Sequence, residues 1–208
     1  MSVRLQGQFL LAGAIGEILA SLLIFLLPGP EGPTGPGSIP TNLVFVMSGV
    51  LLLIGLPALY RTQAKQIRLL GLIGVVLLWV ATICLFFVLS AVKILGVAVP
   101  GLIPHPGGEG PPLLAIISMI LGVVLTLIGG VIVGITTIRA HIFAAAIGWI
   151  IIVSPVLLLL TGPLSGLLGV ILTSVCFGLF YAGLAWAGAT LSFRGSPTQV
   201  SQSSVQRN

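Results

Sequence analysis

Charged residues are scarce in this 208-residue chain, and aspartate is absent altogether. Lys, Arg, Asp and Glu together make up 5% of the residues, whereas soluble globular domains usually carry about 25%. Hydrophobic residues make up 57%. So few polar groups cannot cover so much apolar surface, and the composition therefore excludes a soluble globular domain. We interpret the net charge of +5 as helix-flanking charge that sets membrane orientation, and we expect no nucleic-acid partner.

The residue combinations that usually carry catalysis are also missing. The chain has no paired carboxylates on one predicted helix and no glycine-rich phosphate loop with a lysine. Its two histidines, His105 and His141, are predicted on opposite membrane faces, so they cannot share a metal ion. His105 with Glu31 and Glu109 would offer a divalent cation too few ligands. We therefore expect no enzyme activity, no catalytic residue, no metal and no cofactor.

Long apolar runs fill most of the chain. The hydrocarbon core of a bilayer is about 30 Å thick and needs about 20 apolar residues for each helical crossing. Six runs qualify: 9–27, 42–60, 69–92, 113–138, 142–160 and 164–191. They predict an all-α membrane protein, a six-transmembrane-helix bundle over residues 1–193. We expect the first run to be a retained helix rather than a cleaved signal peptide, and the polar tail, 194–208, to be disordered.

The basic residues predict how the chain is oriented. With both termini in the cytoplasm, seven of the eight Lys and Arg residues lie on inner segments, as the positive-inside rule requires. The exception, Lys93, falls at the outer end of the third run, where its stem can carry the ammonium to the headgroups. A single helix over residues 113–160 would be about 72 Å long. The chain must therefore reverse between the fourth and fifth runs in a tight inner hairpin.

Two segments predicted on the outer side are rich in proline and glycine, residues 28–40 and 100–112. Such residues stop helices, so these segments form either rigid turns or a lid over an outward cavity. A weak internal echo also appears. LLLIG at 51–55 and LTLIG at 125–129 are each followed by a basic residue at a common offset of 74. The echo favours tandem two-helix units of parallel orientation, although low-complexity apolar sequence also produces such echoes by chance.

Glu17 is the only acidic residue within a predicted span. A charged side chain at the bilayer centre costs about 2.5–3.5 kcal/mol on insertion scales, so Glu17 should face the other helices. Its neighbours three and four residues away are Gly13, Ala14, Ala20 and Ser21. All are small, which lets another helix approach closely. Two roles stay open: a proton or cation site in a transport path, or a neutral carboxyl hydrogen-bonded to a neighbouring helix.

The fourth run carries small residues at every fourth position. Ser118, Gly122, Thr126, Gly130 and Gly134 drift only about 40° around the helix at each step, so they form one continuous face. Faces of this kind allow two helix backbones to approach closely in lipid. We expect this stripe to be a helix-packing face, and the alternative is a substrate groove lined by glycine carbonyls.

Prolines and cysteines also fall inside predicted spans. Pro57 and Pro155 each remove one backbone hydrogen bond and should kink their helices. Ser154 is placed to satisfy a carbonyl that the second proline frees. Cys84 and Cys176 differ in predicted depth by about 10 Å. A disulfide needs Cα atoms within about 7 Å, so we expect none between them.

Three basic residues follow the second run. Arg61, Lys65 and Arg68 stand at i, i+4 and i+7, along one side of any helical extension of that run. Anionic lipid headgroups attract each such residue by about 1 kcal/mol. They are a solvated topology signal or, as the sharper alternative, an anionic-lipid contact.

The stretch GVLLLIGLPALYRTQAKQIRLLGLIG, residues 49–74, resembles a recurring segment of uncharacterised multi-pass bacterial membrane proteins. In those proteins a GLPALY-type helix end leads into a basic loop and then a glycine-spaced helix. The resemblance covers about an eighth of the chain and implies a location in the bacterial cytoplasmic membrane. It implies no activity and transfers no site residue.

Two functions remain from different classes. The first is a non-enzymatic structural or accessory subunit that associates with itself or with a membrane partner. The second is a small transporter or channel that uses Glu17. Because carriers usually place several polar groups at the membrane midplane and the sequence indicates one, the structural role ranks first. A water-accessible cavity that reaches Glu17 would reverse this order.

Overall fold

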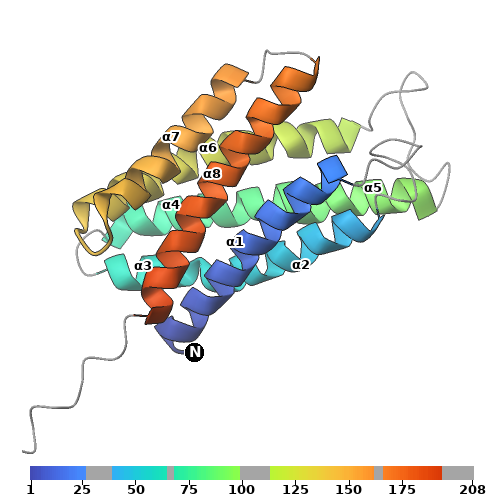
Figure 1. The fold of residues 1–208 in the computed structure, drawn as a ribbon. Coiled ribbons are helices and arrows are strands. Elements are labelled where there is room, and N and C mark those ends of the chain that lie inside the picture. The colour runs from blue at the N-terminus through green and yellow to red at the C-terminus, as the bar shows by residue number, and fades with distance from the viewer. Residues whose placement is uncertain (27–38, 65–67, 99–112, 162–165, 194–208) are drawn as a thin grey trace, which may run out of the picture.

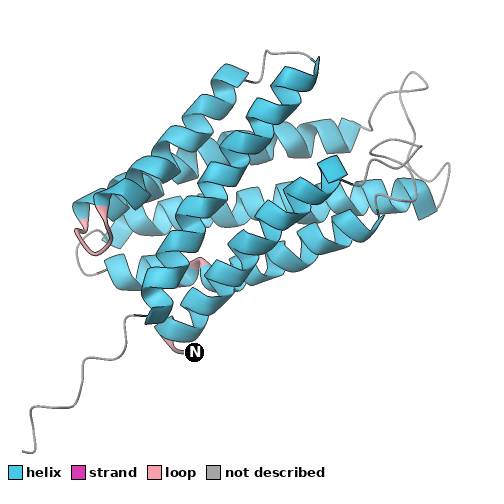
Figure 2. Ribbon diagram, viewed as in Figure 1, coloured by secondary structure: helices cyan, strands magenta, loops and turns pink. Residues whose placement is uncertain are grey.

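A computed structural model describes residues 1–26, 39–64, 68–98, 113–161 and 166–193, and over these ranges every regular element is helical (Figures 1 and 2). In chain order the helices are α1 (Val3–Leu26), α2 (Ile39–Gly55), α3 (Pro57–Gln63), α4 (Arg68–Thr82), the π-helical segment η3 (Ile83–Val88), α5 (Leu89–Ala98), α6 (Leu113–Arg139), α7 (Ala145–Thr161) and α8 (Gly166–Phe193). The predicted outer segments and the tail lie outside the described residues.

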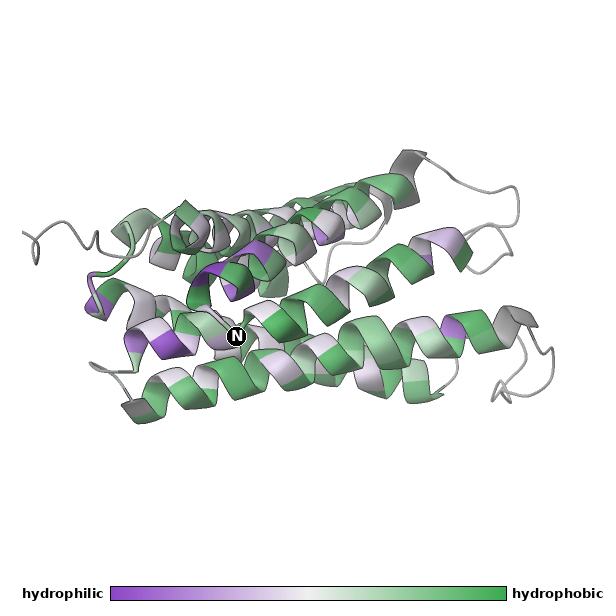
Figure 3. Cartoon of the chain, turned by 90° about the horizontal axis from the view of Figure 1, so that it is seen from below, coloured by the Kyte–Doolittle hydropathy of each residue, from purple (hydrophilic) through white to green (hydrophobic). Residues whose placement is uncertain are grey.

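Five of the described helical stretches are long and apolar enough to cross a membrane. They are Val3–Leu23, Ile39–Gln63, Leu69–Leu95, Leu113–Arg139 and Ile171–Phe193. The helix that matches the fifth predicted run, Ala145–Thr161, is apolar but has only 17 residues. The protein is therefore a helical, multi-pass membrane protein. Figure 3 shows hydrophobic colour along most of each helix.

The helix ends differ from the predicted runs in ways that the contacts explain. The first helix begins at Val3 rather than at residue 9, since the Ser2 hydroxyl caps this end by accepting a hydrogen bond from the Leu5 amide. The second run breaks into α2 and α3 at Leu56, because Pro57 has no amide hydrogen to donate. The third run contains the π-helical turn η3, which no feature of the sequence predicts.

Pro155 lies inside α7 without ending it. The Ser154 hydroxyl donates to the carbonyl oxygen of Ile150 at 2.6 Å. Pro155 has no amide hydrogen, so the carbonyl oxygen of Ile151 loses its hydrogen bond within the helix. We expected the Ser154 hydroxyl to bond this carbonyl, but it bonds the neighbouring one, that of Ile150. The Ile151 oxygen instead faces α6, where a Cβ on Gly130 would lie 3.3 Å from it. Close approach of α6, rather than the serine, covers this carbonyl.

The helices close into a ring. Helix α1 contacts α2, and α2 contacts both η3 and α5. These two segments contact α6, which packs on α7, and α7 packs on α8. Helix α8 then returns to α1, while α4 packs on α6 (Figure 1). Glycines make the tightest of these seams. A methyl group on Gly188 of α8 would lie 2.7 Å from the Leu11 amide nitrogen and 2.9 Å from the Gly7 carbonyl oxygen of α1. The first and last helices therefore meet backbone to backbone.

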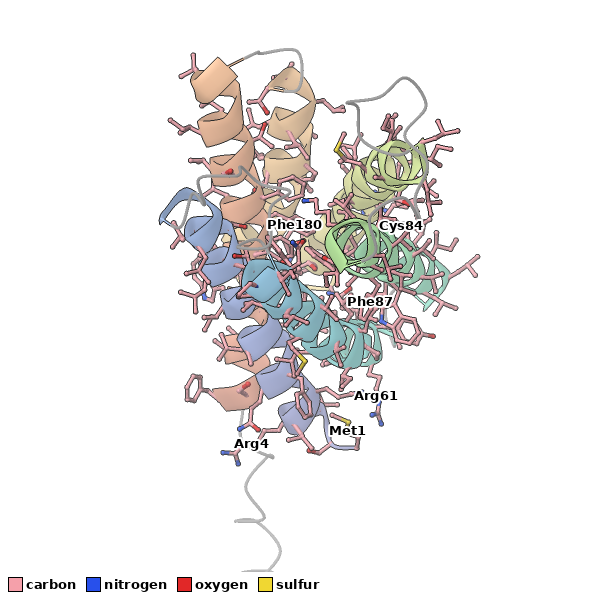
Figure 4. All side chains as sticks on the ribbon, turned by 90° about the vertical axis from the view of Figure 1, so that its right-hand side faces the viewer. Met1, Arg4, Arg61, Cys84, Phe87 and Phe180 are labelled. Atoms are coloured by element: carbon pink, nitrogen blue, oxygen red, sulfur yellow. The ribbon has the colours of Figure 1, made fainter. Side chains whose placement is uncertain are left out.

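Both ends of the described chain lie at one end of this ring. Gly7 near the start of α1 packs on Leu191 near the end of α8. Arg61 donates to the Met1 carbonyl oxygen at 3.0 Å, and Figure 4 shows Met1, Arg4 and Arg61 grouped together. At this end the predicted reversal between the fourth and fifth runs is confirmed, since α6 ends at Arg139 and α7 begins at Ala145.

Candidate binding cavity

A cavity of about 600 Å³ opens between the helices of the ring, and α1, α2, η3, α5, α6, α7 and α8 all contribute to its wall. Several of its lining residues, such as Met119, Ile120 and Leu159, are exposed, so the cavity is open on one side. Its size is typical of small-molecule sites, which usually measure about 300–1,000 Å³. The polar residues of the wall come from α1, α2, α5 and α8: Glu17, Ser21, Asn42, Ser90, Lys93, Thr173, Ser174 and Tyr181.

The opposite side of the wall is apolar. The α6 and α7 residues that line the cavity are Met119, Ile120, Val123, Val124, Leu158 and Leu159. The cavity thus has one polar and one apolar side. A ligand that suits both sides would itself carry polar groups on one side of an apolar body.

Glu17 lies in this wall at an unusual position. Its side chain has no exposed surface, and neither carboxyl oxygen has a hydrogen-bond partner in the described part of the chain. One of the two expected roles, a hydrogen bond to a neighbouring helix, is therefore not made here. Because the carboxyl is fully buried although the residue lines the cavity, it stands just behind the wall surface.

Close packing of α1 on α2 turns Glu17 toward the inside of the ring. A methyl group on Gly13 would lie 2.8 Å from the Leu52 amide nitrogen and 2.9 Å from the Ser48 carbonyl oxygen. The small neighbours foreseen from the sequence thus serve the α1–α2 contact, one turn away from the carboxyl. On the α8 side, Tyr181 lies near enough for a charge on Glu17 to act on its hydroxyl group.

Lys93 is the functional candidate that sequence reasoning missed. It was expected to extend to the outer headgroups, yet in the structure it is half-buried in α5 and lines the same cavity as Glu17. The π-helical turn accounts for the difference. The Leu89 amide donates to the carbonyl of Cys84, five residues back, and the extra residue in this turn rotates everything after it by about 100°.

Five aromatic rings form a cluster at the cavity wall, which we call the aromatic floor. Phe86 of η3 joins Phe45 of α2, at 5.8 Å between ring centroids, to Tyr181 of α8 at 6.1 Å. Tyr181 also contacts Phe180 at 5.4 Å and Phe177 at 6.5 Å. All but Phe180 line the cavity. These distances are typical of stabilising ring pairs, and Figure 4 shows Phe180 amid the helices.

Beyond the aromatic floor lies a much smaller void. It holds about 10 Å³ and is lined in part by Thr82, Thr126 and Tyr181. A void of this volume has room for roughly one water molecule. Further toward the end that holds Met1, the Gln63 amide donates to the Thr137 hydroxyl at 2.9 Å in a fully buried contact. Polar groups therefore continue past the floor, but the rings separate them from the large cavity.

The stripe of small residues on α6 is buried along its whole length. Gly122 faces Leu85 of η3, whereas Gly130 faces Phe180 of α8 and Pro155 of α7. A methyl group on Gly134 would lie 2.7 Å from the Gly148 carbonyl oxygen of α7. The remaining members are Ser118 and Thr126, and the Thr126 hydroxyl donates to the carbonyl of its own helix at Gly122. These residues lie in helix contacts at the positions expected of a packing face.

The three basic residues after the second run do not share one helix. Arg61 belongs to α3 and Arg68 begins α4, while Lys65 lies outside the described residues. The second run has no helical extension that would carry all three on one side, since α3 ends at Gln63 and α4 begins at Arg68. Arg61 is also engaged with the start of the chain through Met1 and Gln6. Contact with anionic lipid stays a prediction.

The remaining candidates add no second site. Cys84 and Cys176 are both free, as expected. Over the described ranges no three His, Cys, Asp or Glu residues gather closely enough to hold a metal ion. His105, Glu31 and Glu109 lie outside these ranges.

Comparison with known proteins gives no further guidance. No protein-family model, no curated protein and no solved structure matches this chain. The functional argument therefore depends on the cavity and on the charged groups in its wall.

Proposed function

We propose that this multi-pass membrane protein is a small transporter, with the central cavity as its solute site and Glu17 as its proton or cation site. One observation carries the proposal. The Glu17 carboxyl is fully buried, has no hydrogen-bond partner among the described residues, and stands at the wall of a 600 Å³ cavity. A buried carboxylate without a partner costs several kcal/mol. A bound proton or cation would remove this cost.

The depth of Glu17 supports this role. It stands 14 residues from the start of α1 and nine from its end, or about 21 Å and 14 Å along the helix axis. Carriers typically hold their coupling ions near the bilayer midplane, between helices that surround a central site. From the sequence alone, the polar groups within the apolar runs were too few for a carrier. In the structure, polar residues from four helices line one cavity.

A purely structural role fits the arrangement less well. A scaffold needs close helix packing, and the glycine seams supply it. It has no need of a large cavity with a buried acid at its wall. The face of small residues on α6 is also occupied within the chain, so it leaves little for self-association or a membrane partner. The transporter needs no catalytic step, and we propose none.

The proposal includes a topology of six crossings with both termini in the cytoplasm of a bacterial cell. It is supported by the position of Met1, Arg4 and Arg61 at the same end of the ring as the last turn of α8. The α7 helix would be the shortest crossing. Its 17 residues extend about 26 Å, close to the minimum for a bilayer.

Flux measurements on purified protein in liposomes test this function. With a pH-sensitive dye or a cation indicator inside, we expect flux down an imposed gradient that exceeds that of empty liposomes. Glu17→Gln should lower the flux to the level of empty liposomes, because the amide keeps the shape but cannot take up a proton or hold a cation. Glu109→Gln, the same chemical change outside the apolar runs, is the matched control. Undiminished flux in a folded Glu17→Gln variant would refute the assignment.

A further inference from the structure

An acidic and a basic side chain line the same cavity without forming an ion pair with each other. Glu17 and Lys93 both line it, yet no ion pair or hydrogen bond joins either side chain to another group in the described chain. Lys93 stands five residues from the end of α5, whereas Glu17 stands nine residues from the end of α1. The lysine is thus nearer the outer end of the ring, and the acid is deeper.

An ammonium group bound beside Glu17 would favour its ionised form, and once both side chains are ionised a ligand with only one charge would leave the other uncompensated. A proton or metal ion satisfies only Glu17, and an anion satisfies only Lys93. A zwitterion satisfies both, since its ammonium can face the carboxylate while its anionic group faces the lysine. The space is also far larger than a proton or a single ion requires.

The rest of the wall favours an apolar body on that zwitterion. The α6 and α7 side of the cavity presents only aliphatic and thioether side chains. Near the polar side, Phe45, Phe177 and Tyr181 offer ring faces, which attract an ammonium group by cation–π interaction. Both the aliphatic side and the rings would contact a hydrophobic moiety between the two charged groups.

We propose that the cavity binds an amphipathic zwitterion, with its ammonium at Glu17 and its carboxylate or phosphate at Lys93. This inference rests on the proposed transport function and names the substrate class of that same cavity. Two sources have this chemistry: free apolar amino acids, and the zwitterionic head group of phosphatidylethanolamine. The aliphatic α6–α7 side accommodates either an apolar side chain or the start of an acyl chain.

Calorimetric titration of the purified protein in detergent tests the two charge contacts separately. The probes are L-phenylalanine, 2-phenylethylamine, which lacks the carboxylate, and 3-phenylpropionate, which lacks the amine. Lys93→Gln should weaken phenylalanine binding at least tenfold, roughly the effect of one lost charge-assisted contact, and leave the amine unaffected. Glu17→Gln should weaken phenylalanine equally and leave the phenylpropionate unaffected. Lys93→Arg keeps the charge and should retain binding, which separates recognition from misfolding.

A second arm tests the lipid source. In liposomes that contain the protein, fluorescent phosphatidylethanolamine should cross between leaflets faster than phosphatidylglycerol, and Lys93→Gln should abolish the difference. A response in either arm supports the zwitterion and identifies its source. The absence of both overturns it. A Glu17→Gln, Lys93→Gln double variant that binds like the parent protein also overturns it, because neither side chain would then contribute to binding.

The outcomes separate this inference from the proposed function. Proton or cation flux that depends on Glu17, without a zwitterion response in either arm, overturns the substrate class and leaves the transporter standing. Zwitterion binding by a protein that moves nothing across liposomes supports the site and refutes transport.

Discussion

Gly188 of α8 stands where the backbones of α8 and α1 come close together. An added methyl group would lie 2.7 Å from the Leu11 amide nitrogen, a backbone atom that cannot move aside cheaply. We expect Gly188→Ala to lower the free energy of unfolding by about 1–3 kcal/mol, as overpacking does elsewhere. Thermal unfolding in detergent measures this. On the same helix Gly178 has open space around it, so Gly178→Ala is the control, and equal destabilisation by both variants would contradict the seam.

The buried hydrogen bond from Gln63 to Thr137 links α3 to α6. Thr137→Val should leave the Gln63 amide unpaired and cost about 1 kcal/mol of stability, since side-chain hydrogen bonds in membrane proteins are individually modest. In the Thr137→Val background, Gln63→Leu should lower the free energy of unfolding by less than it does in the parent protein. A double-mutant cycle by thermal unfolding measures this coupling. Strict additivity would show that the bond contributes nothing, and Thr62→Val, which only loses hydrogen bonds within its own helix, serves as a comparison.

At this scale the sequence indicated some residues and could not indicate others. Glu17 was singled out because an acid in an apolar run is costly wherever it lies. The α6 stripe was visible because a spacing of four residues repeats on one helix. The place of Lys93 in the cavity wall was not foreseen, since its facing depends on a π-helical turn that no residue type announces. Whether Lys93 lies near Glu17 also depends on which helices pack side by side. The spacing of residues along one helix does not reveal that packing.

Among the elements, η3 has the clearest consequence. It places Phe86 between the Phe45 and Tyr181 rings, in the middle of the aromatic floor. Phe86→Ala should remove the ring that joins α2 to α8 and raise the passive proton leak of protein-containing liposomes. Removing a buried ring also costs about 3–5 kcal/mol, so Phe86→Leu is the milder variant. Phe87→Leu changes the adjacent residue, outside this cluster. Equal proton leak through the parent protein and all three variants would show that the aromatic floor does not block proton passage.

The helix boundaries were largely predictable, because apolar runs and the proline- and glycine-rich segments between them mark where helices lie. The internal echo also has a counterpart in the described helices. The Thr62 hydroxyl donates to the Leu59 carbonyl, and the Thr136 hydroxyl, 74 positions later, donates to the Val133 carbonyl. Gln63 and Thr137, which bond each other, are separated by the same 74 residues. Duplication of a two-helix unit stays a prediction that these paired contacts favour.

For the whole molecule, orientation in the membrane can be measured directly. With Cys84 and Cys176 replaced by serine, single cysteines at positions 2 and 207 should react with an impermeant maleimide only after the cells are opened. A cysteine at position 107, in a predicted outer segment, should react on intact cells. These outcomes follow from the positive-inside distribution of lysine and arginine. Reaction of position 2 on intact cells would invert the proposed topology.

The ring and its cavity were beyond the reach of the sequence. Inside a bilayer, lipid tails are as apolar as leucine side chains, so hydrophobicity does not determine which helices pair. The pairing instead follows backbone approach at glycines such as Gly7 and Gly188. With 28 glycines in the chain, many alternative seams are compatible with the same composition. The decision between scaffold and transporter depended on that arrangement.

The seam between α1 and α8 has a consequence for how the protein is made. During synthesis the first helix enters the membrane long before its partner leaves the ribosome, and until then one side of α1 faces lipid or an insertion factor. Among the described helices α8 is translated last, so the cavity wall around Glu17 is completed only then. A nascent chain arrested before residue 166 would therefore expose Glu17, the acid of its apolar runs, to the bilayer.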